Sequence, residues 1–442
     1  MSTSFDYLVI GGGSGGIASA RRAASYGAKV ALIESTSTLG GTCVNVGCVP
    51  KKIMFNTATI NEILHGARHY GYDIENYSFD WGKIKEARDA YIKKLNGIYG
   101  NNLKNSGVTL ITGTAAFVGP KTVKVDDVEY SAEHVLVAVG GRPMAMDGLP
   151  GAELTIDSNG FFALEEQPDR VAVVGAGYIA VEMAGIFNAL GTNTHLFVRH
   201  DRALRKFDTM LQDTLDQEMK KAGMHVHPHW TTKRVYQDEE TGKYMMESED
   251  GKMEGPFDVV LMAIGREPQT RALNLEAAGV DIDSKGYVTV DPYQQNTNAP
   301  GVYALGDVAG QVELTPMAIA AGRRLADRLF GGIAGAKADY DNVPSVIFSH
   351  PTIGTVGLTE AEARAEHGDD AVKVYMSRFT NLFYGHWQIP VEDKQKTAMK
   401  VICVGEEERV VGLHIIGMGA DEMLQGFGVA VRMGCTKVSR QS

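Results

Sequence analysis

The sequence predicts an α/β fold in which one strand–glycine turn–helix unit occurs twice and a smaller α+β domain follows. Three observations support this prediction. Two glycine-rich turns each follow an apolar run, the 51 glycines fall in short turns, and strand-like runs precede a helix beyond residue 344. A chain of 442 residues is long enough for about three domains. Its 44% hydrophobic and 22% charged residues are ordinary for a globular protein.

The first unit begins with the apolar run Tyr7-Leu8-Val9-Ile10, which has the length of a buried strand. A glycine-rich turn and an alanine-rich helix to about Ser25 follow, and a second strand, Lys29 to Ile33, ends at Glu34. Glycines let the backbone approach a pyrophosphate, and the helix N-terminus offers N–H groups to it. The turn residues expected to contact a dinucleotide are Gly11, Gly13, Ser14 and Gly16.

The second unit repeats this order. Val171-Ala172-Val173-Val174 precedes Gly175-Ala176-Gly177, a helix from Tyr178 to about Leu190 and a strand from Thr194 to Val198. One such match is weak evidence, but two matches that each lie between a strand and a helix are strong evidence for Rossmann-like dinucleotide-binding domains. A pair of ordinary α/β turns is the alternative.

Charge at the end of each second strand distinguishes the two dinucleotides. Glu34 can accept hydrogen bonds from ribose hydroxyls and would repel a 2′-phosphate, so the first site suits FAD or NAD. The second strand is followed by a basic cluster, from Arg199 to Lys206, which includes Arg205. Arginine binds phosphate through two parallel hydrogen bonds, so the second site suits NADPH unless the cluster is only a solvated loop. A flavin-type signature from Thr297 to Asp307 favours FAD in the first site.

Two of the four cysteines, Cys43 and Cys48, stand close together and follow the first unit directly. A zinc site would need about four ligands, and no further cysteine lies near. A dithiol that opens and closes beside a flavin accounts better for the pair, and Lys51 could stabilise a thiolate. A passive structural disulfide is the alternative.

The cysteine segment and both nucleotide units resemble the class I pyridine nucleotide–disulfide oxidoreductases, and their order from Asp6 to about Lys437 is similar to the glutathione reductase type. The resemblance implies that an NADPH domain is inserted in an FAD domain. It assigns residues 1–145 and 271–343 to the FAD-binding domain, 146–270 to the NADPH-binding domain and 344–442 to an incomplete α+β dimerisation domain. It also implies a homodimer that reduces glutathione disulfide with FAD and NADPH.

The resemblance implies a role for each site residue. Cys48 would be the flavin-facing thiolate and Cys43 the thiol that attacks the substrate. Lys51 would lie beside the flavin and pair with Glu182, and Tyr178 would cover the nicotinamide pocket. The other implied contacts are Thr42, Asp307 and Thr315 to FAD, and Arg199, Arg205 and Arg266 to NADPH. The positions that match the family's glutathione pocket are Ala18, Arg21, Ile98, Tyr99, Asn102 and Arg323.

The end of the chain differs from the family pattern. The family has an acid–base histidine in a His-Pro-Thr segment near its C-terminus, whereas this chain ends at Lys437-Val438-Ser439-Arg440-Gln441-Ser442. The resemblance therefore leaves an alternative open: a flavoprotein or diaphorase that is impaired as a disulfide reductase. The same tripeptide occurs at His350, which we interpret as structural.

The remaining features exclude several function classes. A net charge of −11 argues against nucleic acid or anionic membranes as partners. The N-terminus resembles no targeting signal and the close cysteine pair suits a reducing compartment, so we expect a cytoplasmic protein. The stretch from Val171 to Leu190 is apolar, but its charge and glycines favour a buried unit over a membrane span. The alternating His225, His227 and His229 could hold a metal, although a surface strand end is the preferred interpretation.

Overall fold

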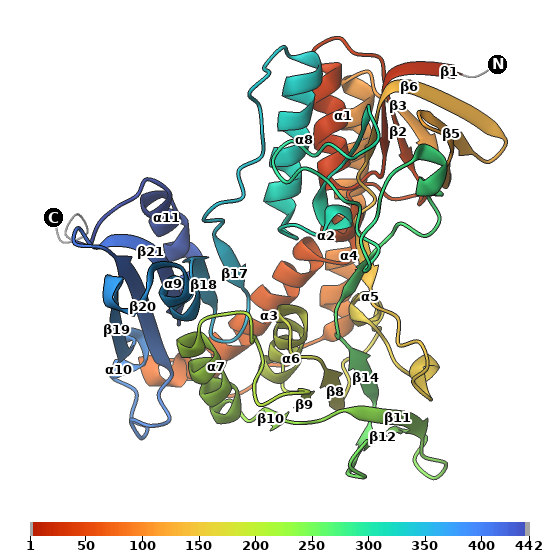
Figure 1. The fold of residues 1–442 in the computed structure, drawn as a ribbon. Helices are drawn as coiled ribbons and strands as arrows, with labels where there is room; N and C mark the ends of the chain where they lie inside the picture. The colour runs from red at the N-terminus through yellow and green to blue at the C-terminus, as the bar shows by residue number, and fades with distance from the viewer. Residues whose placement is uncertain (1–2, 438–442) are drawn as a thin grey trace. The chain divides into compact units, whose positions relative to one another are not determined.

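The computed structural model describes residues 3–437 and divides the chain into two compact units. The first unit contains the residues up to Lys51, Lys83–Met144 and Arg266–Tyr340, and the second contains Lys52–Gly82, Ala145–Gly265 and the residues from Asp341 onward. Figure 1 shows the elements of both. The last residues, 438–442, on which the expected departure from the family pattern depends, lie outside the described residues.

A seven-stranded sheet forms the centre of the first unit, in the order β3-β2-β1-β6-β5-β4, with β16 paired to β6. Its strands β1, β2, β3, β6 and β16 pair in parallel, and β4, β5 and β6 form an antiparallel meander. The strands span Thr3–Ile10 (β1), Val30–Glu34 (β2), Thr109–Thr112 (β3), Ala115–Gly119 (β4), Thr122–Val125 (β5), Val128–Val137 (β6) and Val302–Ala304 (β16).

The helices of the first unit lie near this sheet. They are α1 (Ser14–Ala24), α2 (Gly41–Asn45) and α8 (Thr315–Phe330), with the 3-10 turns η3 (Leu275–Ala278) and η4 (Gly306–Ala309) and the short ribbon of β7 (Gly141–Pro143) and β15 (Arg266–Pro268). Two long helices, α3 (Cys48–Gly66) and α4 (Trp81–Asn105), continue from one unit into the other.

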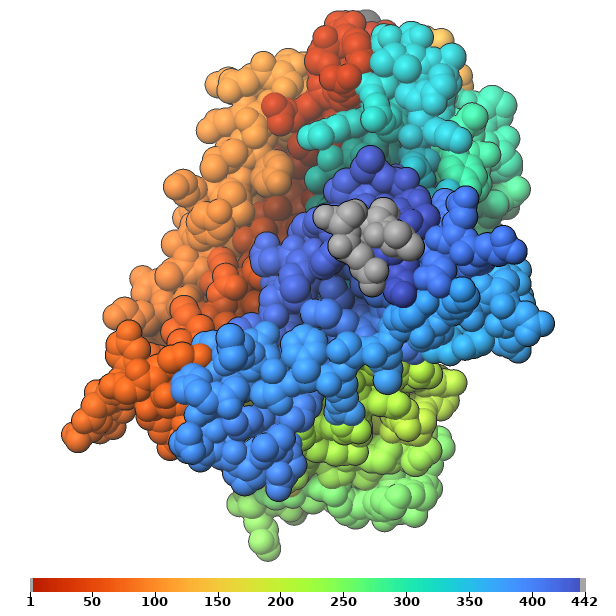
Figure 2. All heavy atoms as spheres, turned by 90° about the vertical axis from the view of Figure 1, so that its left-hand side faces the viewer, coloured from red at the N-terminus to blue at the C-terminus, as the bar shows by residue number. Residues whose placement is uncertain are grey.

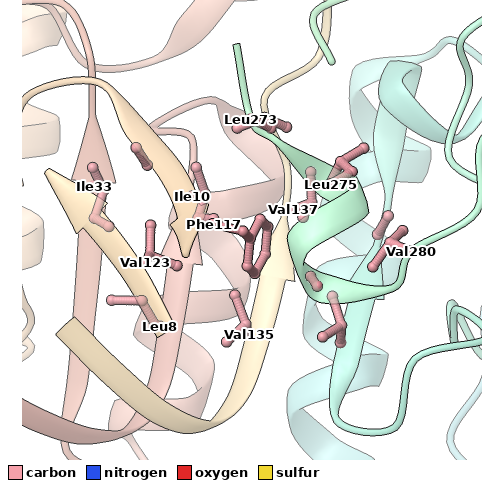
Figure 3. Close-up of a cluster of buried hydrophobic side chains, with 14 of the residues drawn as sticks. Leu8, Ile10, Ile33, Phe117, Val123, Val135, Val137, Leu273, Leu275 and Val280 are labelled. Carbon is pink, nitrogen blue, oxygen red and sulfur yellow. The ribbon is translucent and has the colours of Figure 1, made fainter. Parts of the chain in front are cut away.

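The strand β1 is buried on both faces of this sheet. Leu8 and Ile10 join an apolar cluster with Phe117 and Val135 on one face, as Figure 3 shows. Tyr7, Val9 and their neighbours join a second cluster on the other face, to which α1 and α8 contribute Ile17, Ala20, Ala321 and Leu325. A strand that is covered on both faces needs a continuous apolar run, which explains why Tyr7-Leu8-Val9-Ile10 lacks polar alternation.

The second unit contains three sheets. A parallel sheet has the order β10-β9-β8-β14, and a small antiparallel sheet has the order β11-β12-β13. These strands span Arg170–Val174 (β8), Asn193–Phe197 (β9), His225–His227 (β10), Thr232–Gln237 (β11), Tyr244–Ser248 (β12), Met253–Phe257 (β13) and Val259–Met262 (β14). The associated helices are α5 (Ser158–Ala163), α6 (Tyr178–Ala189) and α7 (Thr209–Lys221), with the turn η2 (Ala152–Leu154).

The third sheet of this unit is antiparallel, in the order β17-β18-β21-β20-β19. Its strands span Ser345–Ile347 (β17), Ile353–Gly357 (β18), Val372–Thr380 (β19), Lys396–Val404 (β20) and Arg409–Ile416 (β21). The helices around it are α9 (Glu360–His367), α10 (Leu382–Gly385) and α11 (Ala420–Arg432), and the remaining turns are η1 (Ala67–Tyr70) and η5 (Asp369–Ala371).

The predicted α/β class is confirmed, including the duplicated unit and the α+β region that follows it. Two elements are longer than the sequence suggested. β1 begins at Thr3, four residues early, because Thr3–Phe5 pair with Tyr130–Ala132 of β6. The last helix begins at Ala420, because Ala420 and Leu424 are buried against the sheet. Among residues 3–437, no helix combines the length and apolar character needed to cross a membrane.

Candidate active site

The first glycine turn brings two backbone segments too close for any side chain. Gly11 has φ +112°, and a Cβ atom there would lie 2.4 Å from the carbonyl oxygen of Ala138. The turn leads into α1, which begins at Ser14 and is not capped by any described side chain. Its first N–H groups are therefore available to an anionic ligand. This cradle fits the pyrophosphate of a dinucleotide.

Glu34 ends β2 and lies against this turn. One carboxylate oxygen accepts a 2.7 Å hydrogen bond from the N–H of Gly12, and the other accepts from the N–H of Thr36 at 2.8 Å and from its hydroxyl at 2.9 Å. These bonds fix the carboxylate and leave a lone pair free on the oxygen that accepts from Gly12, since each oxygen can accept about two hydrogen bonds. The negative charge predicted beside a ribose is therefore in place.

A glycine contact that the sequence analysis did not use joins the cysteine loop to the dinucleotide turn. The N–H of Gly40 donates to the carbonyl of Gly12 at 2.8 Å, and Gly13 and Gly40 form a parallel β-bridge. The adjacent glycines at 40 and 41 were the available sequence signal, because such pairs often mark close backbone approaches. The bridge places the start of α2, which carries Cys43, directly against the turn.

The two predicted redox cysteines lie together. Cys43 is half-buried in α2, Cys48 is the exposed first residue of α3, and both are thiols that hydrogen-bond one another. The Cys48 sulfur also lies 3.6 Å from the hydroxyl of Thr315, the first residue of α8. The family resemblance implied a flavin contact for Thr315, and the structure adds this contact with the thiol.

The two thiols differ strongly in acidity. The hydrogen bond from Cys43, the Thr315 hydroxyl and the Lys51 charge together lower the pKa of Cys48 to about 6, against the opposing effect of the protein atoms that shield its sulfur from water. The same hydrogen bond, with burial, raises the pKa of Cys43. At neutral pH the pair therefore holds a thiolate on Cys48 and a protonated thiol on Cys43.

Asp307 and Arg266 also belong to the first unit. Asp307 lies in η4, and burial raises the pKa of its carboxyl group despite the nearby charge of Arg266. The Arg266 guanidinium donates to the carbonyl of Gly141 at 2.6 Å. Arg266 had been predicted to contact NADPH, and in this structure its bonding partner belongs to the first unit.

Three of the six predicted substrate residues line one cavity of about 540 Å³, on which α1 and α8 both border. They are Ala18, Arg21 and Arg323. The other three, Ile98, Tyr99 and Asn102, lie on α4 and do not line it. Tyr99 instead lies within electrostatic range of Cys43: burial raises the pKa of its hydroxyl, and a negative charge on Cys43 would raise that pKa further.

The cavity contains charged groups that sequence reasoning missed. Arg22 and Arg324 line it together with Asp327, which is only 2% exposed. One Asp327 oxygen accepts from Arg22 Nε at 2.5 Å and from the Tyr26 hydroxyl at 2.9 Å, and the other lies 3.4 Å from Arg324. The cavity wall therefore has four guanidinium groups and one carboxylate, which is suited to an anionic ligand.

The second glycine turn matches the first in geometry. Gly175 has φ +150°, and a Cβ atom there would lie 2.2 Å from the carbonyl oxygen of Ala263. Gly177 precedes α6, which no described side chain caps, and Tyr178 is the first residue of that helix, 39% exposed. Glu182 is buried and accepts a 2.8 Å hydrogen bond from the N–H of Phe348. Lys51 belongs to the first unit and Glu182 to the second, so their predicted pairing stays a prediction.

The basic loop after β9, residues 199–206, approaches this second turn. The N–H of Leu204 donates to the carbonyl of Ala176 at 2.8 Å. Arg199, Arg205 and Lys206 are exposed, and within residues 3–437 they have no ion-pair partner. Arg202 differs, because it pairs with Asp213 of α7. Three free cations beside an uncapped helix N-terminus are suited to a phosphate group.

The histidine run contributes one residue to a cluster that the sequence could not show. His227 of β10 lies 2.9 Å from His195 of β9 and 3.7 Å from Glu254 of β13, nitrogen to nitrogen and nitrogen to oxygen. In the described part of the chain, these three residues form the group with metal-ligand potential. Arg170 donates to His195 Nε2 at 3.2 Å, so Nδ1 carries the proton and donates to His227. The nitrogens of His195 are thus both used in hydrogen bonds.

His350 is far from the cysteine pair in the sequence, and it belongs to the second unit, whereas both cysteines belong to the first. Its Nδ1 lies 2.9 Å from a carboxylate oxygen of Glu62, and its ring packs against Phe55 at a centroid distance of 4.8 Å. These contacts are those expected of a residue that packs α3 against the segment after β17.

Comparison with known proteins agrees with this geometry. Residues 5–322 match the description "Pyridine nucleotide-disulphide oxidoreductase", and residues 343–440 match the dimerisation domain of the same group. The chain is 51% identical to a glutathione reductase of Schizosaccharomyces pombe, over 99% of this chain and 95% of that protein. It is 48% identical to a glutathione reductase of Yarrowia lipolytica, over 98% of this chain and 94% of that protein. The chain belongs to the pyridine nucleotide–disulphide oxidoreductase family.

Proposed function

We propose that this chain reduces glutathione disulfide to two molecules of glutathione at the expense of NADPH. The observation that carries the proposal is the pair of unlike thiols, Cys43 and Cys48, held against a dinucleotide turn by the Gly40–Gly12 hydrogen bond. Two relatives about half identical over nearly the whole chain are named glutathione reductases. The alternative of a flavoprotein or diaphorase impaired in disulfide reduction has no support from them.

The first turn fits FAD. A Cβ atom would fill the cradle at Gly11, α1 is uncapped, and Glu34 supplies a fixed carboxylate where a ribose would lie. The residues that would hold the cofactor are Gly11, Gly13, Ser14, Gly16, Glu34, Thr42, Lys51, Asp307 and Thr315. When bound, the flavin would carry two electrons from the nicotinamide to the cysteine disulfide.

The second turn fits NADPH. The free cations Arg199 and Arg205, joined by Lys206, supply the positive charge that a 2′-phosphate requires. Gly175 and Gly177 would admit the pyrophosphate, and Tyr178, Glu182 and Arg266 are the further proposed contacts.

The cysteines would then act in sequence on the substrate. The Cys48 thiolate accepts the proton of the Cys43 thiol through the hydrogen bond between them, and the Cys43 sulfur attacks one sulfur of glutathione disulfide. The substrate S–S bond breaks, one glutathione leaves with that proton, and a mixed disulfide forms on Cys43. Cys48 then attacks the Cys43 sulfur, which closes the protein disulfide and releases the second glutathione. A hydride from NADPH and one proton balance the cycle.

The arginine-lined cavity suits this substrate. Glutathione disulfide carries more carboxylates than ammonium groups, so a wall with four guanidinium groups and one carboxylate attracts it. Ala18, Arg21 and Arg323 are the proposed contacts in the cavity, and Ile98, Tyr99 and Asn102 the proposed contacts on α4.

We assign residues 1–145 and 271–343 to FAD binding, 146–270 to NADPH binding and 344–442 to dimerisation. The match of residues 343–440 to a dimerisation domain supports a homodimer. Cytoplasmic location is proposed because four cysteines in 442 residues do not make a secreted disulfide framework, which favours a reducing compartment.

Rapid mixing under anaerobic conditions tests the proposal. Addition of NADPH to the flavin-loaded protein should produce a long-wavelength absorbance band from the Cys48 thiolate beside the flavin. Addition of glutathione disulfide should then remove the band and consume one NADPH per disulfide. A band that persists after glutathione disulfide is added would contradict the proposal and favour the impaired flavoprotein.

A further inference from the structure

The basic loop of residues 199–206 is fixed at its far end by a buried ion cluster. Asp208 follows Lys206 by two residues and is 2% exposed. Its Oδ1 accepts from the N–H of Met210 at 2.9 Å, which caps α7, and from the Lys400 ammonium at 2.8 Å. Its Oδ2 accepts from the N–H of Glu360 at 3.1 Å. Three separate groups therefore determine where this carboxylate lies.

Lys400 completes the cluster from the antiparallel sheet. It belongs to β20, is 4% exposed, and contacts a carboxylate oxygen of Glu360 at 2.8 Å as well as Asp208. A buried ammonium is stable only where carboxylates and hydrogen bonds replace water. Burial opposes ionisation of Asp208, but the Lys400 contact and two backbone N–H groups outweigh it and lower the pKa of that carboxyl. The cluster is therefore ionic at neutral pH.

The cluster connects two sheets of the same unit. α7, which begins after Asp208, packs against β20 and β21. In Figure 2, the yellow-green surface that includes α7 adjoins the blue surface of the C-terminal segments. The loop is thus held at Leu204 by the glycine turn and at Asp208 by the antiparallel sheet, with Arg205 and Lys206 exposed between these two anchors.

We infer that Asp208 and Lys400 are positioning residues that hold the basic loop in place for the 2′-phosphate of NADPH. The inference rests on the proposed use of NADPH. Recognition of a phosphate by guanidinium and ammonium groups needs donors in fixed places, and small displacements far from the reacting atoms can be costly. NADH lacks the 2′-phosphate, so the position of this loop should matter little for NADH.

The direction in which the KM for NADPH changes distinguishes a positioning role of Asp208 from an effect of its charge alone. Asp208 carries a negative charge near a phosphate site, so its neutralisation alone would strengthen phosphate binding. Loss of position would weaken it instead. The two explanations therefore predict opposite changes in the KM for NADPH.

Asp208→Asn in the flavin-loaded protein tests the inference. We expect the KM for NADPH to rise about 5- to 10-fold, while kcat at saturating NADPH and the KM for NADH change less than about twofold. A general disturbance of the structure would instead raise the KM for NADPH and the KM for NADH by similar factors. An unchanged or lower KM for NADPH would overturn the inference.

Two further variants complete the test. Glu360→Gln removes the other carboxylate contact of Lys400 but lies outside the loop segment, so its effect on the KM for NADPH should be smaller than that of Asp208→Asn. Lys400→Arg keeps the charge and changes the geometry, and it replaces Asp208→Asn if that variant does not fold. A rise in the NADPH KM with Lys400→Arg supports the inference, and equal changes for NADPH and NADH contradict it.

The wild-type protein distinguishes failure of the inference from failure of the proposed function. If the wild type shows no preference for NADPH over NADH, the proposed use of NADPH is wrong. If it prefers NADPH and Asp208→Asn keeps the same ratio of kcat/KM values, the proposed function stands and the positioning role is wrong.

Discussion

The two glycine turns have nearly the same backbone and opposite charge. Gly11 and Gly175 both take positive φ, and each comes within about 2.5 Å of a facing carbonyl oxygen if a Cβ is added. The first turn meets the carboxylate of Glu34, whereas the second meets a loop with free cations. Under the proposed function, the shared backbone would supply the site for a pyrophosphate, and a few side chains at the strand ends would select the ribose.

A second difference concerns chemistry. The first turn contacts the cysteine loop through Gly40. The cysteines of the second unit, Cys403 and Cys435, belong instead to the apolar cluster of its antiparallel sheet. Single substitutions can test whether the two regions divide the work in this way.

Cys48→Ser should reduce the oxidation of NADPH by glutathione disulfide at least about 1,000-fold, because the second thiol exchange needs a sulfur at this position. The long-wavelength absorbance band should disappear as well. Cys403→Ser is the matched control, since Cys403 is fully buried in the antiparallel sheet and should leave both readouts near wild type. If Cys48→Ser kept the band, the assignment of the thiolate to Cys48 would be wrong.

Gly11→Ala and Gly175→Ala should separate the two nucleotides. The new methyl group would clash with a backbone carbonyl in each case. We expect Gly11→Ala to lose bound flavin, seen as a colourless protein after purification. Gly175→Ala should keep the flavin and lose reduction by NADPH. Loss of flavin from both variants would show that the two turns do not bind separate cofactors.

Arg205→Gln should raise the KM for NADPH about 10- to 100-fold and leave the KM for NADH nearly unchanged, because a charge-assisted phosphate contact is lost. Glu34→Gln serves as the matched change in the first unit. It should weaken flavin retention without altering the ratio of NADPH to NADH use. If Glu34→Gln changed the ratio of NADPH to NADH use, the two strand ends would not serve separate cofactors.

The redox pair should show a pH dependence near 6. Because the pKa of Cys48 is lowered to about 6, its thiolate is present above that pH and is lost as the pH falls through it. In the flavin-loaded protein reduced by NADPH, the long-wavelength band from the Cys48 thiolate should appear as the pH rises through this transition. Thr315→Ala removes a hydrogen bond to the thiolate and should move the transition upward by less than about one pH unit. A transition near pH 9 in the wild type would contradict the assignment.

Arg202→Gln should have the smallest effect, below about twofold on the KM for NADPH. Arg202 lies in the same basic loop as Arg205, but its guanidinium is already paired with Asp213. A paired cation contributes less to a ligand than a free one, because it would have to break its existing contact. A loss as large as that of Arg205→Gln would show that net charge, and not the free cations, selects the phosphate.

Much of the site was predictable because its signals are local. The glycine spacing, the apolar strand runs and the Cys43–Cys48 interval each report the conformation of a short segment, and the structure has the elements where these patterns placed them. The places of Glu34 and the basic loop were also predictable, because the end of the second strand has a fixed position relative to the glycine turn in this kind of unit. The early start of β1 was not, since it depends on pairing with β6.

Local sequence patterns were sufficient to predict the two nucleotide units, the cysteine pair and the opposite charges at the two strand ends. Only the tertiary structure decided that Thr315 touches Cys48, that Asp327 joins Arg22 to Arg324 in the cavity wall, and that Lys400 holds Asp208. Periodicity and spacing describe neighbours along the chain, but contacts between residues far apart in the sequence form only when packed sheets and helices bring them together. Acidity at Cys48 and the placement of the basic loop both depend on such contacts.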